Sequence, residues 1–292
     1  MSMDTTINKA SALVEALPYF QSFRGHTFLI KMGGSAMEDP ALVRKVMRDI
    51  VFLEIAGINP VIVHGGGKAI SAAMEEAGLE AKFIGGFRVT TPEAIEIVEQ
   101  TLSKTINPHL VEMIVELGGK ANGIPGTEVF LAQRIQATDE SGQKVDVGRV
   151  GEAVSCELSA IHSVLASEFV PVISPLGSEK GTGKPLNVNA DLAAACLAKA
   201  LGATKLVYLS DVPGILADPS NDDSLIPSIN RSQAAELIED GTIHGGMLPK
   251  INSALDALAN NVSKVHFIDG RVPHSLLLEI FTRSGIGTEI VG

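Results

Sequence analysis

Short apolar runs, each followed by a stretch with helical periodicity, constrain the fold of this sequence more than any other feature. This alternation is typical of βαβ units on a mostly parallel sheet. The runs are continuously apolar, as expected for strands that helices cover on both faces. The sequence therefore predicts an α/β fold with an open, mostly parallel central sheet. Its expected strands are His26–Lys31, Pro60–His64, Val170–Ser174, Lys205–Ser210 and Lys264–Ile268.

Two helices between these strands are well signalled. In the first, Asp39 is a suitable N-cap, Pro40 suits the first turn, and Gly57 marks the end. The second runs over Pro92–Leu117 and stops at two glycines. The segment Ala121–Gly151 instead contains alternating and turn-forming residues, which predict an antiparallel hairpin inserted near one end of the sheet.

The composition excludes several classes of protein. Hydrophobic residues make up 45% of the 292 residues, which excludes a disordered chain, and no apolar run suits a membrane span. The N-terminus lacks the pattern of a signal peptide. A formal net charge of −11 argues against a nucleic-acid surface. We therefore expect a cytoplasmic protein whose partners are small molecules, with neither nucleic acid nor membrane among them. Cys156 and Cys196 show no metal or redox spacing and are expected to be ordinary buried thiols.

Residues 1–25 form a separate helical arm in this interpretation. Leu13, Val14, Leu17 and Phe20 make a short apolar stripe, and Pro18 is expected to kink or end the helix. Such a stripe needs a covering surface, which either the chain's own body or a neighbouring subunit could supply.

Two expected strands run directly into glycine clusters. Lys31 precedes Gly33 and Gly34, and His64 precedes Gly65–Gly67. Glycines let the backbone approach a ligand closely, and the N–H groups that open the next helix favour an anion. Neither cluster has the spacing of a Walker A or a dinucleotide-binding loop. Tight turns would explain one such junction, but two on adjacent strands favour an anion site.

Two lysines occupy positions where a core residue is expected. Lys31 ends an apolar strand, and Lys250 falls on the buried stripe of a helix that follows Gly245 and Gly246. An inward-facing ammonium needs an anionic partner. For each lysine the alternative is a side chain that extends its charged end into water.

Polar residues precede an Ala-rich helix. Asn187, Asn189 and Asp191 alternate, so they would share one side of an extended segment. Helix capping explains Asn189 or Asp191 but not all three. A second polar turn, Ser210–Leu216, follows a strand and suits the adenine or ribose of a nucleotide.

Two lysines, two glycine clusters and an aspartate, without a nucleophile–base pair, fit phosphoryl transfer. Catalysis of that reaction consists mainly of positioning and of neutralising charge on the transferring group. A carboxylate acceptor is ionised at pH 7, since its reference pKa is about 4.3, and it needs no general base.

Seven motifs in order now make a resemblance recognisable, and the match spans nearly the whole chain. The sequence resembles the acetylglutamate kinases of the amino acid kinase family. The motifs are K-x-GG-x-A-M at Lys31–Met37, HGGGK at His64–Lys68, GFRVT at Gly86–Thr90, N-V-N-A-D at Asn187–Asp191, SDVPGIL at Ser210–Leu216, GGMLPK at Gly245–Lys250 and SGIGT at Ser284–Thr288.

The resemblance implies a three-layer αβα sandwich of amino acid kinase type. Residues 26–202 would bind the acyl amino acid and residues 203–292 the nucleotide, with the change of role near Gly202. No low-complexity linker divides the chain, so both lobes are expected to share one continuous sheet.

The resemblance also implies roles for individual residues. Lys31 and Lys250 would neutralise the γ-phosphoryl group in transit, and Asp191 would hold both lysines. Arg88 would pair with the α-carboxylate of the acyl amino acid, whereas a surface salt bridge is its alternative. The other substrate-binding residues would be Gly66, Gly67, Asn187 and Asn189. The ATP-binding residues would be Gly33, Gly34, Ser210, Asp211, Gly214, Ile215, Gly246 and Met247.

The implied reaction is ATP-dependent phosphorylation of N-acetyl-L-glutamate to N-acetyl-L-glutamyl 5-phosphate, in arginine (ornithine) biosynthesis. Mg²⁺ would arrive with ATP and need no metal site on the protein. The arm and the segment Val265–Thr288 resemble those of ring-like hexamers inhibited by arginine. We therefore expect a homo-oligomer, a dimer or a hexamer, with L-arginine as a candidate inhibitor.

Three departures from the family pattern keep alternatives open. Met32 and Ser35 replace a tyrosine and an asparagine that are common there, and Ala121–Ala132 differs from the usual sequence. N-acetyl-aminoadipate is therefore the nearest rival substrate. A non-catalytic nucleotide or arginine sensor is a second alternative. A third is a family member that acts on aspartate, glutamate, carbamate or UMP.

Overall fold

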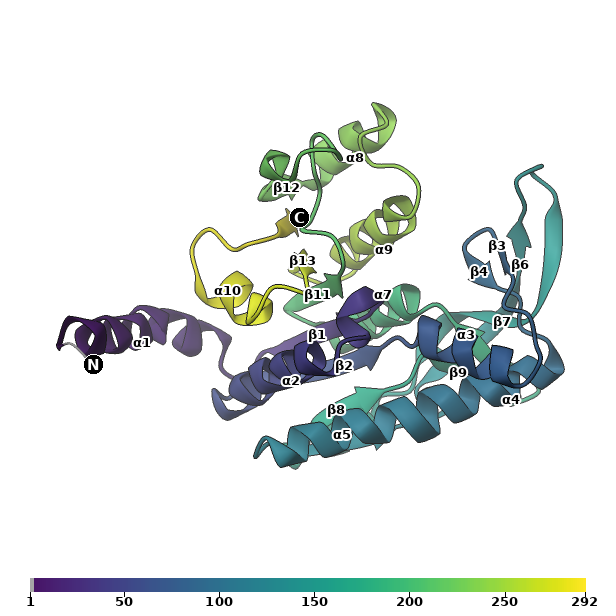
Figure 1. Cartoon of the computed structure of the whole chain (residues 1–292), viewed down its shortest axis with the longest axis horizontal. Coiled ribbons are helices and arrows are strands. Elements are labelled where there is room, and N and C mark those ends of the chain that lie inside the picture. The colour runs from purple at the N-terminus through teal and green to yellow at the C-terminus, as the bar shows by residue number, and fades with distance from the viewer. Residues whose placement is uncertain (1–2) are drawn as a thin grey trace.

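Eight strands form one open sheet at the centre of the molecule (Figure 1). The structure is a computed structural model that describes residues 3–292, except for the side chains of residues 4–6, 8, 9, 35 and 36. Neighbouring strands in the order β12–β14–β13–β11–β1–β2–β8–β5 are parallel, except that β13 and β14 are antiparallel. The five predicted strands are confirmed within one residue at each end. The bounds are β1 Thr27–Met32, β2 Asn59–His64, β5 Ala121–Ile124, β8 Val170–Ile173, β11 Lys205–Ser210, β12 Ser228–Asn230, β13 Lys264–Asp269 and β14 Thr288–Val291.

Helices cover both faces of this sheet and confirm the three-layer αβα architecture. One buried cluster joins the sheet to α2 (Pro40–Ile55), α5 (Asn107–Glu116) and α10 (Ser275–Phe281). A second cluster joins the opposite face to α6, α7 and α9. Those helices, with α8 beyond them, are α6 Ser159–Ala166, α7 Ala190–Leu201, α8 Arg231–Glu239 and α9 Met247–Ala259. Because strands from both halves of the chain share the sheet, its continuity is also confirmed.

The signalled helices form largely as predicted. Asp39 caps α2 by accepting a hydrogen bond from the Ala41 amide. The long helix predicted over Pro92–Leu117 is continuous but contains a π-helical segment. Its parts are α4 Pro92–Glu99, η2 Gln100–Ile106 and α5. A π-helical turn widens the helix locally and is frequent at functional sites.

The predicted hairpin Ala121–Gly151 is right in type but wrong in extent. Its antiparallel strands are β6 (Phe130–Thr138) and β7 (Lys144–Cys156), which close a small barrel with β9 (Leu176–Glu179) and β10 (Pro185–Val188). The first residues instead form β5, which joins the central sheet parallel to β8. Pairing with a strand far along the chain leaves no local signal, so the sequence could not assign β5. Two shorter strands, β3 (Phe83–Ile84) and β4 (Phe87–Arg88), pair nearby.

The N-terminal helix α1 (Met3–Phe23) contains Pro18 in its interior, so the expectation that this proline could end the helix is wrong. Tertiary packing supports the last turn. Phe20 lies 5.1 Å and Tyr19 6.2 Å from the ring centre of Phe281 in α10. Figure 1 shows the rest of α1 extending away from the body. Within residues 3–292, no helix is both long and apolar enough to cross a membrane.

Candidate functional site

The two glycine clusters lie side by side, as the sequence predicts. Strand β1 pairs with β2 on one side and with β11 on the other, so their carboxyl ends meet at one edge of the sheet. The Gly65 amide donates to the Met32 carbonyl at 2.7 Å and ties the two loops together. Gly34 has a φ of +65°, and a Cβ there would lie 3.4 Å from the Asp211 carboxyl carbon. This edge therefore brings three strand ends within reach of one ligand.

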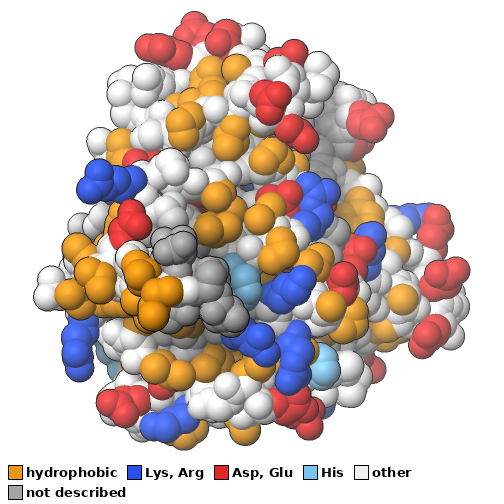
Figure 2. Space-filling view, turned by 60° about the vertical axis from the view of Figure 1, so that its left-hand side comes forward, with side chains coloured by type: hydrophobic (Ala, Val, Ile, Leu, Met, Phe, Trp, Pro, Cys, Tyr) orange, Lys and Arg blue, Asp and Glu red, His pale blue; other side chains and the backbone are white. Residues whose placement is uncertain are grey.

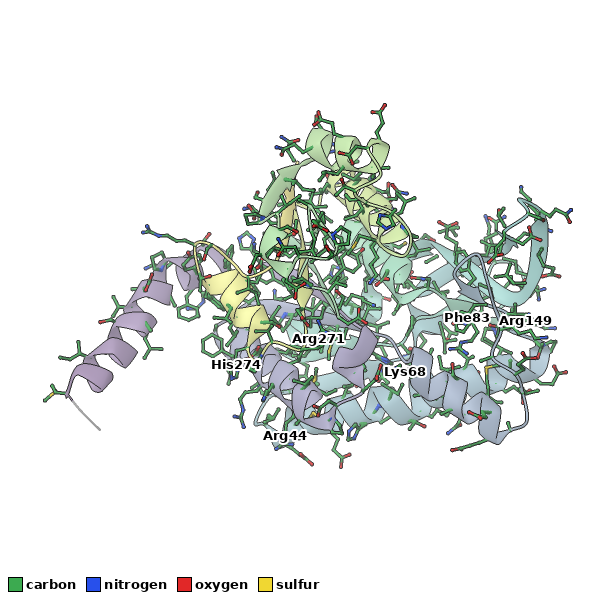
Figure 3. All side chains as sticks on the ribbon, turned by 45° about the horizontal axis from the view of Figure 1, so that its top comes forward. Arg44, Lys68, Phe83, Arg149, Arg271 and His274 are labelled. Atoms are coloured by element: carbon green, nitrogen blue, oxygen red, sulfur yellow. The ribbon has the colours of Figure 1, made fainter. Side chains whose placement is uncertain are left out.

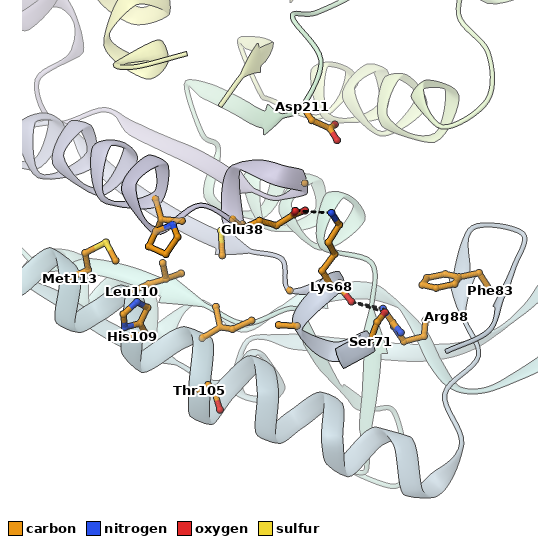
Figure 4. Close-up of a pocket in the computed structure, with 18 residues that line it drawn as sticks. Glu38, Lys68, Ser71, Phe83, Arg88, Thr105, His109, Leu110, Met113 and Asp211 are labelled. Atoms are coloured by element: carbon orange, nitrogen blue, oxygen red, sulfur yellow. Dashed lines mark hydrogen bonds and ion pairs between the residues drawn. The ribbon is translucent and has the colours of Figure 1, made fainter. Parts of the chain in front are cut away.

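Two adjoining cavities open at this edge. The smaller, of about 220 Å³, gathers most of the predicted catalytic and acyl-substrate residues. The larger, of about 620 Å³, shares part of that wall and continues past Lys68 and Asp211 (Figure 4). Predicted residues that line the smaller cavity are Lys31, Gly33, Gly34, Gly66, Gly67, Arg88, Asn187, Asn189 and Asp191.

Lys31 and Asp191 form an ion pair inside this site. Lys31 Nζ lies 2.8 Å from Asp191 Oδ1, and the lysine is only 7% exposed. The lysine is therefore not extended into water. The Lys31 ammonium is the partner of this buried oxygen, which accepts no further hydrogen bond from the described residues. A Cβ on Gly33 would overlap the Lys31 ammonium, so the glycine leaves room for the ammonium in its present position.

Arg88 is a buried cation that faces both cavities. Its Nη2 atom donates to the Gly67 carbonyl at 2.7 Å and to Ser71 Oγ at 2.9 Å. The Phe83 ring lies 4.6 Å from the guanidinium carbon. Burial lowers the pKa of Arg88. Among residues 3–292 no carboxylate pairs with it, so the alternative of a surface salt bridge is wrong. A buried cation without an anionic partner is unfavourable unless a ligand supplies the anion.

Two other cations near this edge already have carboxylate partners. Lys68 on α3 (Gly67–Glu76) lies 2.6 Å from Glu38, and Arg271 after β13 lies 2.7 Å from Asp269 (Figure 3). The Lys68 side chain is 78% exposed and the Arg271 side chain 50%, whereas Arg88 is buried. Of these three cations, Arg88 alone is buried without a carboxylate partner.

The smaller cavity is lined by Asn187, Asn189 and Asp191. The sequence suggested that these three residues share one side of an extended segment, but they do not. Asn187 lies in β10, and its side-chain amide donates to Thr90 Oγ1 at 3.2 Å. Asn189 caps α7 by accepting from the Asp191 amide at 2.8 Å. The chain turns into the helix at Asn189, which breaks the alternation.

His64 and Asn107 support the second glycine loop. His64 is fully buried, and burial lowers its pKa to about 4. Its Nδ1 atom donates to the Gly65 carbonyl at 2.9 Å, and Nε2 accepts from the Asn107 amide at 3.2 Å. His64 is therefore neutral and positions the loop. Sequence reasoning missed Asn107, although a polar residue on the apolar stripe of a predicted helix was a signal.

The π-helical segment η2 packs directly against Gly66 of the second glycine loop. A Cβ on Gly66 would come within 2.6 Å of the Ile106 side chain and 2.7 Å of Leu102. Both contacts come from η2 and therefore fix how closely the glycine loop approaches the helix.

The predicted nucleotide residues lie mainly away from the two cavities. Among the predicted nucleotide residues that follow β11 in the sequence, Asp211 is the one that lines a cavity, the larger of the two. The amide of Ile215 donates to Thr288 Oγ1 at 2.8 Å, next to Gly214. Gly246 and Met247 begin α9. Ser210 ends β11. Ser210 and Asp211 therefore lie beside the end of β1, which carries Lys31, whereas Gly214, Ile215, Gly246 and Met247 line neither of the two cavities.

Lys250 lies in the first turn of α9, where its side chain makes no ion pair with residues 3–292. Helix α9 packs against α7, the helix that carries Asp191. The Lys250 carbonyl accepts from Ser253 Oγ at 2.8 Å, and that oxygen lies 3.0 Å from the Tyr208 hydroxyl. Tyr208 in turn donates to the Asp191 carbonyl at 3.3 Å. The backbones of the two predicted catalytic residues are thus connected.

The fold and this site define an α/β protein with glycine loops and buried cations at the carboxyl ends of neighbouring strands. The chain belongs to the amino acid kinase family, because the model of that family matches residues 26–269. It is similar to "Acetylglutamate kinase" of Akkermansia muciniphila, with 62% identity over 98% of this chain and 96% of the relative. It is 44% identical to "Acetylglutamate kinase" of Halothermothrix orenii over 99% of both chains. The resemblance inferred from the motifs is confirmed.

Solved structures agree with this assignment. N-acetylglutamate synthase of Neisseria gonorrhoeae, complexed with coenzyme A and N-acetyl-glutamate, is 27% identical with a TM-score of 0.83. The match covers 97% of this chain but 63% of that one. A complex of the same synthase with coenzyme A and L-arginine has a TM-score of 0.80 at 26% identity, over 97% and 65%. Carbamate kinase of Giardia lamblia shares the fold, with a TM-score of 0.64, 17% identity and coverage of 91% and 98%.

Proposed function

We propose that this chain transfers the γ-phosphoryl group of ATP to the side-chain carboxylate of N-acetyl-L-glutamate. The product is N-acetyl-L-glutamyl 5-phosphate, an intermediate of arginine (ornithine) biosynthesis. The observation that carries this proposal is Arg88, a buried guanidinium that opens into a cavity without a carboxylate partner. A dicarboxylate substrate supplies one carboxylate to Arg88 and leaves the other for reaction. Full-length relatives named acetylglutamate kinase support this choice.

The acyl amino acid would occupy the smaller cavity. Arg88 would bind the α-carboxylate in a bidentate manner. Asn187 would contact it from the opposite wall, while Gly66 and Gly67 would let the backbone approach the substrate. The Asn189 side chain is engaged as a helix cap, so its contribution is to hold the start of α7. This arrangement directs the side-chain carboxylate toward Lys31.

Charge neutralisation would drive the transfer itself. Lys31 lies between the glycine loops and would neutralise the transferring group. Lys250 would join it from α9, with Asp191 between the two ammonium groups. The acceptor carboxylate is ionised at neutral pH and needs no general base. His64 fits this scheme, since both of its ring nitrogens are already engaged.

ATP would bind across the carboxyl ends of β1 and β11. Gly33 and Gly34 would contact its phosphates, and the turn after β11 with the start of α9 would hold the nucleoside. Mg²⁺ would enter on the ATP phosphates and neutralise part of their charge. Residues 3–292 contain no cluster of three or more His, Cys, Asp or Glu side chains that could hold the ion alone.

Two of the sequence departures bear little on the choice between N-acetylglutamate and N-acetyl-aminoadipate. Met32 is fully buried in the core cluster that includes α2, away from the cavities. None of residues 121–132 lines either cavity. The Ser35 side chain lies outside the described part of the structure. Met32 and residues 121–132 therefore give no reason to prefer the longer acid.

A hydroxylamine trap for acyl phosphate tests the proposal. The protein is incubated with MgATP and a panel of acidic amino acids, acylated and free. We expect hydroxamate only with N-acetyl-L-glutamate. Product with N-acetyl-aminoadipate instead would move the assignment to the rival substrate. If ATP binds but no acid yields product, the chain is a sensor and the kinase proposal is wrong.

Substitution of Lys250 tests the least supported of the catalytic roles. We expect Lys250→Ala to lower kcat at least about 100-fold and to change KM for the acyl substrate by less than about threefold. The reason is that the lysine charge matters most in the transition state. Lys250→Arg, which keeps the charge, is the matched control and should retain more activity. An equal loss in kcat and in acyl-substrate affinity would contradict the role.

We propose that the enzyme is a cytoplasmic homo-oligomer inhibited by L-arginine, a dimer or a hexamer. The arm and the C-terminal segment act together in this proposal, since Tyr19 and Phe20 of α1 pack on Phe281 of α10. The arginine complex of the related synthase adds support. Deletion of residues 1–20 is expected to reduce the oligomer mass and to weaken inhibition by arginine. Unchanged mass and inhibition after the deletion would remove the basis for the proposal.

A further inference from the structure

Two cysteines that are far apart in the sequence meet in the fold. Cys156 ends β7 and Cys196 lies in the middle of α7. Their Sγ atoms are 3.6 Å apart, and both thiols are free. Both residues are half-buried, so the expectation of ordinary buried thiols is wrong. Neither residue is fully buried, and the two Sγ atoms need to come closer by about 1.5 Å to reach the length of a disulfide bond.

The surroundings make the two thiols chemically unequal. A hydrogen bond from Cys156 lowers the pKa of Cys196, and the positive charge of Lys199, three residues along α7, lowers it further. Burial of Cys196 and the charges of Asp256 and Glu152 act in the opposite direction. The pKa of Cys156 is raised, first by its hydrogen bond to Cys196 and then by burial. Cys196 is therefore the thiol that more readily becomes a thiolate, the nucleophilic form of cysteine.

We propose that Cys156 and Cys196 are a redox modification site, at which a small peroxide converts the two thiols into an intramolecular disulfide. The Cys196 thiolate attacks one peroxide oxygen, the O–O bond breaks, and a sulfenic acid forms on Cys196. The leaving hydroxide takes the proton released by the Cys196 thiol and becomes water. Cys156 Sγ then attacks Cys196 Sγ, the S–O bond breaks, and the oxygen leaves as a second water with the Cys156 proton. The two thiols are oxidised by two electrons, and one peroxide is reduced.

The disulfide would join two parts of the acyl-substrate site. In β7, Val150 pairs with Asn187 of β10 and lies six residues before Cys156, and in α7 Asp191 lies five residues before Cys196. The bond closes a long loop that contains β8, β9 and β10, and restricts the unfolded chain. A gain in thermal stability follows, which we expect to raise Tm by about 5 °C.

The test uses the full chain treated with stoichiometric hydrogen peroxide. We expect both thiols to disappear together, the intact mass to fall by two hydrogen atoms, and a peptide containing Cys156 to be linked to one containing Cys196. Dithiothreitol should restore both thiols and the original Tm. Cys156→Ser and Cys196→Ser are the controls, and neither should show the rise in Tm. Cys156→Ser should form sulfenic or higher oxidation products on Cys196, and Cys196→Ser should be oxidised more slowly.

The single-cysteine variants also test the order of the steps. Serine at position 156 can still donate a hydrogen bond, so Cys156→Ser should react with iodoacetamide faster than Cys196→Ser. Equal rates would overturn the assignment of Cys196 as the attacking sulfur. Two thiols that survive peroxide, a disulfide between two chains, or an oxidised form without a higher Tm would each overturn the proposal.

Discussion

At the scale of single residues, the site depends on how each cation is placed. Arg88 is buried without a carboxylate, whereas Lys31 is buried against Asp191. The first arrangement requires an anion from outside, and the second keeps an ammonium in place before the substrates arrive. A cation held by an internal partner needs little rearrangement at the moment of reaction. This difference supports the roles proposed for the two residues, in substrate binding and in transfer, respectively.

Gly33 offers a way to move the Lys31 ammonium without removing it. We predict that Gly33→Ala lowers kcat by about 100-fold, because the new methyl group occupies the place of the Lys31 ammonium. The obstructing atom is the end of a flexible side chain, so the lysine can shift and the free energy of unfolding should change by less than about 1 kcal/mol. Steady-state kinetics and urea unfolding measure the two quantities. A large loss of stability with unchanged kcat would contradict the prediction.

His64 predicts a pH dependence of stability. Its pKa in the folded protein is about 4, below the ordinary value of 6.5, so below about pH 6.5 the unfolded chain binds a proton that the folded protein excludes. The contribution of neutral His64 to the free energy of unfolding is complete above pH 6.5 and is lost as the pH falls toward 4. We expect a loss of about 2 kcal/mol between pH 7 and pH 5.

The glutamine variant isolates this contribution. Glutamine does not titrate but can accept the Asn107 hydrogen bond, so His64→Gln should depend on pH more weakly than the wild type by about that amount. Urea unfolding at both pH values measures the difference. Parallel pH profiles for the two proteins would show that His64 is not the cause.

At the scale of elements, the site depends on the packing of α7, α9 and β11. Helix α7 carries Asp191, α9 carries Lys250, and β11 presents Tyr208 between them. The Tyr208 ring stacks on Phe267 with a centroid distance of 5.0 Å, which fixes its hydroxyl toward the two helices. The relative position of the two predicted catalytic residues is therefore set by an interior hydrogen-bonded link.

Tyr208→Phe tests this link. The variant keeps the stacked ring and loses the hydroxyl contacts to Ser253 and the Asp191 carbonyl. We predict a fall in kcat of about fivefold with an unchanged KM for the acyl substrate, since one neutral hydrogen bond contributes about 1 kcal/mol. Ser253→Ala should have a similar effect, and the double variant little more. If Tm falls while kcat stays constant, the link stabilises the fold without positioning α9.

At the scale of the whole molecule, α1 exposes an apolar surface that its own body does not cover. Its last turn is anchored through Phe20, but Leu13, Val14 and Leu17 are 65%, 69% and 50% exposed. Figure 2 shows hydrophobic side chains at the surface on the side from which α1 projects. A patch of this kind on a projecting helix favours contact with another subunit. The sequence left open whether the chain's own body or a neighbouring subunit covers the apolar stripe. The body covers the aromatic end of the stripe at Phe20 and leaves Leu13, Val14 and Leu17 exposed.

Substitution of this stripe tests the subunit contact. We predict that Leu13→Ser, Val14→Ser and Leu17→Ser together lower the oligomer mass measured by analytical ultracentrifugation. The melting temperature of the body should change by less than about 3 °C, because these side chains do not pack in its core. Phe20→Ala is the contrasting variant, since Phe20 contacts the body. A triple variant with an unchanged mass would assign the oligomer contact to another surface.

The sequence by itself determined the parallel strands, the capped helix α2, the glycine loops and the residue types of the site. These features depend on local patterns, which continuous apolar runs, Asp39 and the glycine clusters display directly. The resemblance then extended the inference to Arg88 and Asp191.

Only the tertiary structure decided which distant residues meet. The ion pair of Lys31 with Asp191, the support of His64 by Asn107, the closed barrel and the meeting of Cys156 with Cys196 all join separate segments. The helix of α1 also continues past Pro18, where contacts with Phe281 outweigh the local preference. Local pattern specifies an element and its faces, but the free energy of long-range packing determines which faces and side chains come together.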